Sequence, residues 1–142
     1  MKSLIRPWLA LLAISALLAA ADLAVDPRAR ALAFAGLAPD EITLASARSH
    51  RGALLWIDAR SQQEFVRGHL PQALNLDPEH WDADLAELLR AWQPGTRVIV
   101  YCREAGCGTS RNVADRLRRE YRLPDVWVLH GGWEAWEEAA RP

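Results

Sequence analysis

Residues 97–111, RVIVYCREAGCGTSR, constrain the fold of this chain more than any other stretch. A short apolar run, residues 98–101, ends at a cysteine, and a loop with two glycines leads into helical sequence from Ser110. This pattern predicts a buried strand, a loop and a helix. Because ligands in open α/β sheets bind beyond the carboxyl ends of the strands, Cys102 stands where a ligand would bind.

Cys102 is a candidate nucleophile. The free amides at the start of the following helix and the neighbouring Arg103 favour the thiolate over the thiol. Loop amides around the sulfur would also hold an anionic substrate. The alternative is a small apolar side chain that fills the end of a buried strand. The candidate substrate-binding residues are those of the loop: Arg103, Glu104, Ala105, Gly106, Cys107, Gly108, Thr109 and Ser110.

Length and charge limit the classes of function. The 142 residues suffice for one domain with a core of its own. The formal net charge is -1, with acidic and basic residues interspersed. Because no basic face is present in the pattern, we expect no nucleic-acid partner.

The first residues have the pattern of an export signal. Two basic residues precede an apolar run at 8–21, which ends in small residues suited to cleavage after Ala21. Residues 1–21 are therefore expected to be a signal peptide, or residues 7–25 an inner-membrane anchor. Residues 22–40, which are Ala-rich with two prolines, are expected to form a linker. We expect a periplasmic domain, soluble or anchored; a cytoplasmic chain with an apolar first helix is the alternative.

The two cysteines allow a disulfide without requiring one. Cys102 and Cys107 are separated by four residues, and an oxidising compartment would let them pair if the loop geometry permits it. A zinc site is disfavoured because Cys-x4-Cys has no second cysteine pair. The four histidines are scattered without ligand spacing: His50, His69, His80 and His130. We expect no metal and no organic cofactor.

Strand and helix patterns alternate along the rest of the chain. Apolar runs typical of strands occur at 54–57, 73–76, 98–101 and 126–129. Helical patterns occur at 44–50, 61–67, 81–92, from 110 and from 133. This alternation predicts an α/β fold with a mostly parallel sheet and helices on both faces.

Three helix starts carry recognisable caps. Thr43 can cap the first helix, and Asp77 before a proline opens another. Ser61 and Glu64 form a capping box, and Phe65 with Val66 is expected to give this short helix its buried side.

Three segments resemble the rhodanese family. Residues 58–76, DARSQQEFVRGHLPQALNL, resemble the signature D-x-R-x-x-x-E-[FY]-x-x-G-H-[IL]-P-x-A-x-N. Residues 98–102 resemble the strand that leads into the family's active cysteine, and residues 128–136 resemble its closing L-x-G-G-x-x-x-W segment. The resemblance covers a domain at about 41–138.

The resemblance implies a three-layer rhodanese-like α/β fold and a sulfurtransferase. Cys102 would carry sulfur as a persulfide, taken from thiosulfate or a similar small donor and passed to cyanide or to a thiol, protein thiols included. It also implies that four residues around the site mainly hold the fold: Asp58, Arg60, Glu64 and His69. Capping by Glu64 and the proline turn beside His69 agree with this reading.

The loop departs from the family pattern, because it has about two extra residues and contains Cys107. Cys107 could therefore act as a resolving thiol against Cys102. A phosphatase of the same fold needs Cys-x5-Arg, but Gly108 stands at that position. Two other functions stay open: a thiol redox element that uses both cysteines, and a binding module that holds a sulfur species or a partner without turnover.

Overall fold

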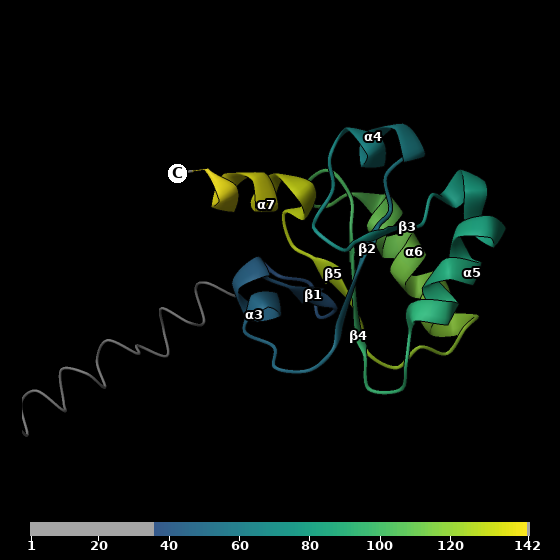
Figure 1. Cartoon of the computed structure of the whole chain (residues 1–142). Coiled ribbons are helices and arrows are strands. Elements are labelled where there is room, and N and C mark those ends of the chain that lie inside the picture. Colours follow the sequence, from purple (N-terminus) through teal and green to yellow (C-terminus); the bar gives the residue numbers. More distant parts are fainter. Residues whose placement is uncertain (1–35, 142) are drawn as a thin grey trace, which may run out of the picture. The chain divides into compact units, whose positions relative to one another are not determined.

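The computed structural model describes residues 36–141, and its centre is a five-stranded sheet (Figure 1). All neighbouring strands are parallel, and their order is β1-β5-β4-β2-β3. Parallel strands need crossover connections, and each of the four connections here contains a helix. The strands are β1 (Glu41–Ile42), β2 (Leu54–Asp58), β3 (Leu74–Asn75), β4 (Arg97–Tyr101) and β5 (Val126–Leu129).

Helices lie on both faces of the sheet (Figure 1), which confirms the three-layer α/β prediction. The predicted caps are present: the Thr43 side chain accepts from the Ser46 amide, Ser61 from Glu64, and Asp77 from Glu79. The helices are α3 (Leu44–Arg48), α4 (Gln62–Arg67), α5 (Trp81–Ala91), α6 (Gly108–Arg119) and α7 (Gly132–Ala140), with the 3-10 helix η1 (Pro78–His80) before α5.

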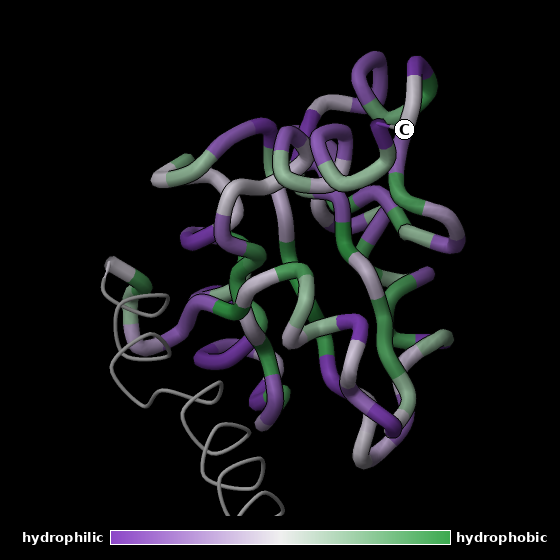
Figure 2. Tube along the Cα trace, turned by 90° about the vertical axis from the view of Figure 1, so that its left-hand side faces the viewer, coloured by the Kyte–Doolittle hydropathy of each residue, from purple (hydrophilic) through white to green (hydrophobic). Residues whose placement is uncertain are grey.

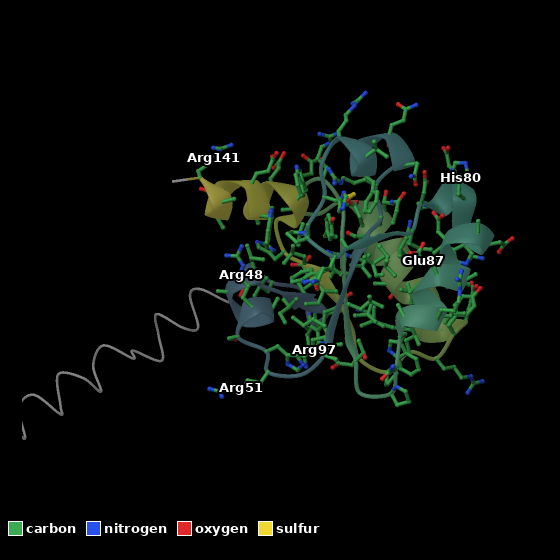
Figure 3. The ribbon with its side chains drawn as sticks, in the orientation of Figure 1. Arg48, Arg51, His80, Glu87, Arg97 and Arg141 are labelled. Atoms are coloured by element: carbon green, nitrogen blue, oxygen red, sulfur yellow. A yellow bond between two sulfur atoms is a disulfide. The ribbon has the colours of Figure 1, made fainter. Side chains whose placement is uncertain are left out.

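Strand β4 divides the core into two layers. Val98 and Val100 face one hydrophobic cluster, which α5 and α6 complete, whereas Ile99 and Tyr101 face the other, which α3 and α7 cover. All four side chains are fully buried. Figure 2 shows hydrophobic residues along the centre of the domain, and in Figure 3 charged side chains such as Arg48 and Glu87 lie on its outside. A strand buried on both faces explains the continuous apolar run in the sequence.

The strand order creates a switch point beside β4. The chain leaves β2 toward β3 on one side, then returns to form β4 on the other side of β2. The connections after β2 and β4 therefore diverge and leave a space beyond their carboxyl ends, where ligands of such sheets bind.

One strand was missed, and two local predictions need correction. The sequence pattern did not predict β1, because a two-residue edge strand has too few residues for a period; Glu41 and Ile42 form it by pairing with β5. Val66 was expected to be buried, but it is 72% exposed, and only Phe65 packs against the core. Helix α6 begins at Gly108 rather than at Ser110, with Cys107 as its cap residue.

The export-signal, anchor and linker predictions concern residues 1–40, of which 1–35 lie outside the described residues. Within residues 36–141, no helix has the length and apolar character that a membrane crossing requires.

Candidate active site

Cys102 directly follows β4, where the sheet register places it beside the end of β2. Asp58 pairs with Tyr101 in that register, and the Ala59 amide donates to the Tyr101 carbonyl at 2.8 Å. The Cys102 residue is only 2% exposed. The candidate nucleophile therefore sits at the bottom of the space beyond the two central strands, as the sequence pattern predicted.

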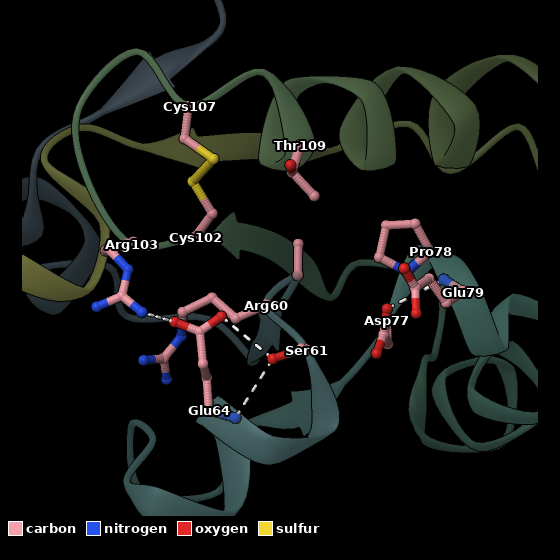
Figure 4. Close-up of a pocket in the computed structure, with 11 residues that line it drawn as sticks. Arg60, Ser61, Glu64, Asp77, Pro78, Glu79, Cys102, Arg103, Cys107 and Thr109 are labelled. Carbon is pink, nitrogen blue, oxygen red and sulfur yellow. Dashed lines mark hydrogen bonds and ion pairs between the residues drawn. A yellow bond between two sulfur atoms is a disulfide. The ribbon is translucent and has the colours of Figure 1, made fainter.

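Cys102 and Cys107 form a disulfide, which the sequence had left open (Figure 4). Their Cα atoms are 6.4 Å apart, a normal separation for a disulfide. Gly106, with a φ of 74°, lets the loop turn back so that Cys107 faces the strand end. The Ser110 hydroxyl lies 3.6 Å from Cys102 Sγ and 3.2 Å from the Cys107 carbonyl oxygen. The loop therefore closes over the nucleophile through its own second cysteine.

The remaining loop residues line the pocket or face solvent. Glu104, Ala105, Gly106 and Gly108 are exposed, Thr109 is half-buried at the pocket wall, and Ser110 is buried. Because Cys107 caps α6, the loop ends at the positive end of a twelve-residue helix, which favours negative charge there.

The start of α7 anchors the cysteine loop. The Trp133 amide donates to the Cys102 carbonyl at 2.7 Å, and the Glu134 amide donates to the Arg103 carbonyl at 3.0 Å. Gly132 has a φ of 54°, and a Cβ there would lie 2.5 Å from the Cys102 carbonyl oxygen. Gly132 thus lets the start of α7 approach the loop backbone directly.

Asp58 and Arg60 form a buried ion pair beneath the pocket. Arg60 Nη2 donates to Asp58 Oδ2 at 2.5 Å and to the Gly68 carbonyl at 2.7 Å, which ties the end of β2 to the end of α4. Its guanidinium also stacks 4.6 Å from the Trp133 ring. Burial alone would lower the pKa of Arg60, but the Asp58 carboxylate outweighs this and raises the pKa overall.

Glu64 does more than cap its helix, because its carboxylate pairs with Arg103 across the pocket mouth (Figure 4). Glu64 comes from α4 and Arg103 from the cysteine loop, 39 residues further along the chain. The positive charge of Arg103, a candidate substrate-binding residue, is therefore partly balanced by an adjacent carboxylate.

His69 lies away from the sulfur. Its Nδ1 is 2.8 Å from the Phe65 carbonyl oxygen, and its ring stacks on the Phe65 ring at 3.9 Å between centroids. His69 is exposed and is not among the pocket-lining residues. These contacts suit a residue that shapes the turn after α4.

The cysteines line an open pocket of about 370 Å³ (Figure 4). Two arginines and three acids contribute to its wall, so the formal charges do not add up to a cationic site. The lining residues are Ala59, Arg60, Ser61, Glu64, Asp77, Pro78, Glu79, Cys102, Arg103, Cys107 and Thr109.

Two residues do more at the site than the sequence indicated: Asn75 was quoted in the motif without a role, and Asp77 was expected only to open a helix. Asn75 Nδ2 donates to the carbonyls of Asp58 and Arg60, both at 2.9 Å, and so holds the loop after β2. Asp77 accepts from the Glu79 amide at 3.0 Å and from the Gln62 amide at 3.2 Å. The second contact joins two helix starts, and no local sequence signal reports it.

Asp77 is ionised more readily than a free aspartate. Burial alone would raise the pKa of Asp77, but the amides of Glu79 and Gln62 and the ring of His80 hold that pKa below its ordinary value. The negative charge at this wall of the pocket therefore persists across the neutral and mildly acidic range.

The geometry gives no support to an oxyanion-binding arginine after the cysteine loop. Arg111, the nearest later arginine, donates to Glu41 Oε1 at 2.5 Å and does not line the pocket. Among residues 36–141, no three His, Cys, Asp or Glu side chains gather in a way that could hold a metal ion.

A family model for the rhodanese-like domain matches residues 41–139. The chain belongs to the rhodanese-like family. The match begins at β1 and ends in α7, so it covers the whole sheet and the cysteine loop.

Solved structures share this fold at low sequence identity. A Bacillus halodurans protein is 19% identical over 70% of this chain and 72% of that chain, with a TM-score of 0.57. A rhodanese-related protein from Thermoplasma volcanium is 20% identical over 72% of this chain and 94% of that one, with a TM-score of 0.55. A Rhodopseudomonas palustris protein described as a possible tyrosine phosphatase is 20% identical, covering 72% and 83%, with a TM-score of 0.51. At this identity the likeness concerns the fold alone.

Proposed function

We propose that this rhodanese-like protein is a sulfurtransferase that carries sulfane sulfur as a persulfide on Cys102. The observation that carries the proposal is the position of Cys102, buried at the end of β4 and at the bottom of a pocket beside the start of α6. The donor is thiosulfate or a similar small sulfane-sulfur compound. The acceptor is cyanide or a thiol, including thiols of other proteins.

The proposed reaction is a double displacement. After reduction of the disulfide, the Cys102 thiolate attacks the outer sulfur of thiosulfate, and sulfite leaves with the electron pair of the broken S–S bond. Backbone amides between Arg103 and Ser110 stabilise the anion during this step. The acceptor then attacks the outer sulfur of the Cys102 persulfide, and the Cys102 thiolate is regenerated. These steps use no metal or organic cofactor.

The N-terminal pattern adds a location to the proposal. An export signal at residues 1–21 or an anchor at 7–25 would place the domain in the periplasm, where a resting disulfide is stable. Activity there requires a reductant that opens the Cys102–Cys107 bond before a donor binds.

The disulfide also favours a second candidate, a thiol redox element that cycles between dithiol and disulfide. That function needs both cysteines and no sulfane-sulfur donor. The two candidates therefore differ in whether the reduced chain gains sulfur.

The test is intact mass of the full chain, reduced and then incubated with thiosulfate. We expect Cys107→Ser, which cannot close the disulfide, to gain one sulfur atom that cyanide removes as thiocyanate. Cys102→Ser should gain none and form no thiocyanate above the uncatalysed rate. A Cys102→Ser chain that still turns over thiosulfate would overturn the proposal. If Cys107→Ser gains no sulfur from thiosulfate, while reduced wild type without any donor loses two hydrogen atoms to oxygen through both cysteines, the redox element is established instead.

A further inference from the structure

Cys107 is the one thiol of the described loop that can reach the sulfur of Cys102 without rearrangement. The two residues are bonded in the folded domain, with Cα atoms 6.4 Å apart. Cys102 is 2% exposed, whereas Cys107 is half-buried and lines the pocket. Any sulfur carried on Cys102 is therefore next to an internal acceptor before an external thiol arrives.

We propose that Cys107 resolves the Cys102 persulfide internally and releases hydrosulfide, which makes the protein a sulfane-sulfur reductase driven by dithiols. This rests on the proposed function, because it takes the Cys102 persulfide as its starting state. It extends that function by adding a product, hydrosulfide, and a class of partner, a dithiol reductant.

The step balances in atoms and electrons. The sulfur of Cys107 attacks the inner sulfur of the persulfide, Cys102 Sγ, and the bond between the two persulfide sulfurs breaks. The outer sulfur leaves with the electron pair and, with the proton of the Cys107 thiol, becomes HS⁻. Two cysteine sulfurs are oxidised to the disulfide, and the outer sulfur is reduced from the sulfane to the sulfide level.

The disulfide identifies which persulfide sulfur is attacked. Attack on the outer sulfur would move the persulfide to Cys107 and leave both cysteines without a direct bond. Attack on the inner sulfur gives the Cys102–Cys107 bond that the folded loop accommodates. The loop geometry therefore matches the product of hydrosulfide release rather than that of sulfur relay.

The surroundings of Cys107 suit an attacking thiol. It is the cap residue of α6, a twelve-residue helix, and so lies at the positive end of the helix dipole. Gly106, with its φ of 74°, provides the turn that points Cys107 back toward the strand end. A thiol held within a short loop also has a far higher effective concentration than a free thiol.

After hydrosulfide release, the disulfide must be reduced again, and the pocket opening gives the reductant access to it. A dithiol reductant attacks the more accessible sulfur, Cys107, and displaces the Cys102 thiolate, whose sulfur lies 3.6 Å from the Ser110 hydroxyl. Its second thiol then attacks the reductant's own sulfur in the mixed disulfide, and the Cys107 thiolate leaves. The reductant departs as an internal disulfide, and both cysteines are again free. Each cycle thus consumes one sulfane sulfur and one dithiol.

The test loads the full chain without relying on its use of thiosulfate. Reduced wild type, Cys107→Ser, Cys107→Ala and Cys102→Ser are treated with inorganic polysulfide, desalted, and followed for hydrosulfide release and intact mass. We expect wild type to release hydrosulfide and form the disulfide at least about tenfold faster than either Cys107 variant, which should retain the added sulfur. Cys102→Ser should release none. The Ala variant controls for the Ser hydroxyl.

The proposal is overturned if wild type retains its persulfide, or if the Cys107 variants release hydrosulfide within about tenfold of its rate. Failure of the proposed sulfurtransferase function looks different. In that case thiosulfate loads no variant, while polysulfide-loaded wild type still divides its sulfur into hydrosulfide and a disulfide.

Discussion

At the scale of single residues, the site depends on side chains that fix the backbone around Cys102. Asn75 holds two carbonyls of the loop after β2, and Arg60 joins that loop to the end of α4. Gly132 lets the α7 amides reach the carbonyls of the cysteine loop. The position of the sulfur is therefore set mainly by backbone contacts, and the residues that make them need not touch a substrate.

Gly132→Ala should destabilise the domain by about 3 kcal/mol and misplace the cysteine loop. The added Cβ would meet the Cys102 carbonyl oxygen at 2.5 Å, on a backbone with a φ of 54°. Gly95→Ala is the matched control, because its φ is 90° and nothing lies within 4 Å of its Cβ. The control should lose only about 1 kcal/mol. Urea unfolding measures both, and equal losses would contradict the role of the close approach.

At the scale of elements, helix starts meet at the pocket. The amides that begin α7 hold the cysteine loop, α6 begins at Cys107, and Asp77 joins the starts of α4 and η1. Free helix amides need acceptors, and here carbonyls and one carboxylate supply them. The elements are thus joined to each other where the chemistry is proposed.

Asp77→Asn should remove an acid-dependent part of the stability. The amide side chain offers one acceptor where the carboxylate offers two, so about 1–2 kcal/mol should be lost at neutral pH. Because the folded pKa of Asp77 is lowered, its contribution is fully present above the ordinary value of about 3.9 and is lost as the pH falls through the folded value.

Urea unfolding of both proteins at a series of pH values checks this. The difference in unfolding free energy should be constant above about pH 5 and shrink below about pH 4. A difference that stays the same down to acid unfolding would show that the carboxylate charge makes no contribution.

At the scale of the whole molecule, the arrangement of charge limits the donor. The chain has a formal net charge of -1, and the pocket wall combines two arginines with three acids. Arg60 and Arg103 are each paired with a carboxylate. A dianion such as thiosulfate is therefore not strongly attracted to this pocket. A change in the charge of the pocket wall should alter kcat/KM for thiosulfate.

Glu79→Gln removes one negative charge from the pocket wall and should raise kcat/KM for thiosulfate about two- to fivefold at low ionic strength. Added salt should shrink the gain, because it screens exposed charges. Glu87→Gln makes the same charge change on an exposed position of α5 outside the pocket lining and should have little effect. Steady-state thiocyanate formation measures all three proteins. A gain that is independent of salt would argue against an electrostatic cause.

Local sequence patterns predict the strands and helices of the core, the caps and the position of Cys102 at a strand end. These features follow from local periods and from neighbours a few residues apart. The folded arrangement was needed to find that Glu64 faces Arg103, that Asp77 serves two helix starts, and that Cys102 and Cys107 are joined. The exposure of Val66 and the pairing of the edge strand β1 also became visible only in the folded structure. Glu64 and Arg103 are 39 residues apart, and no local pattern encodes which distant segments the fold brings together. Cys102 and Cys107 are only five positions apart, but whether their sulfurs meet depends on how the loop between them turns.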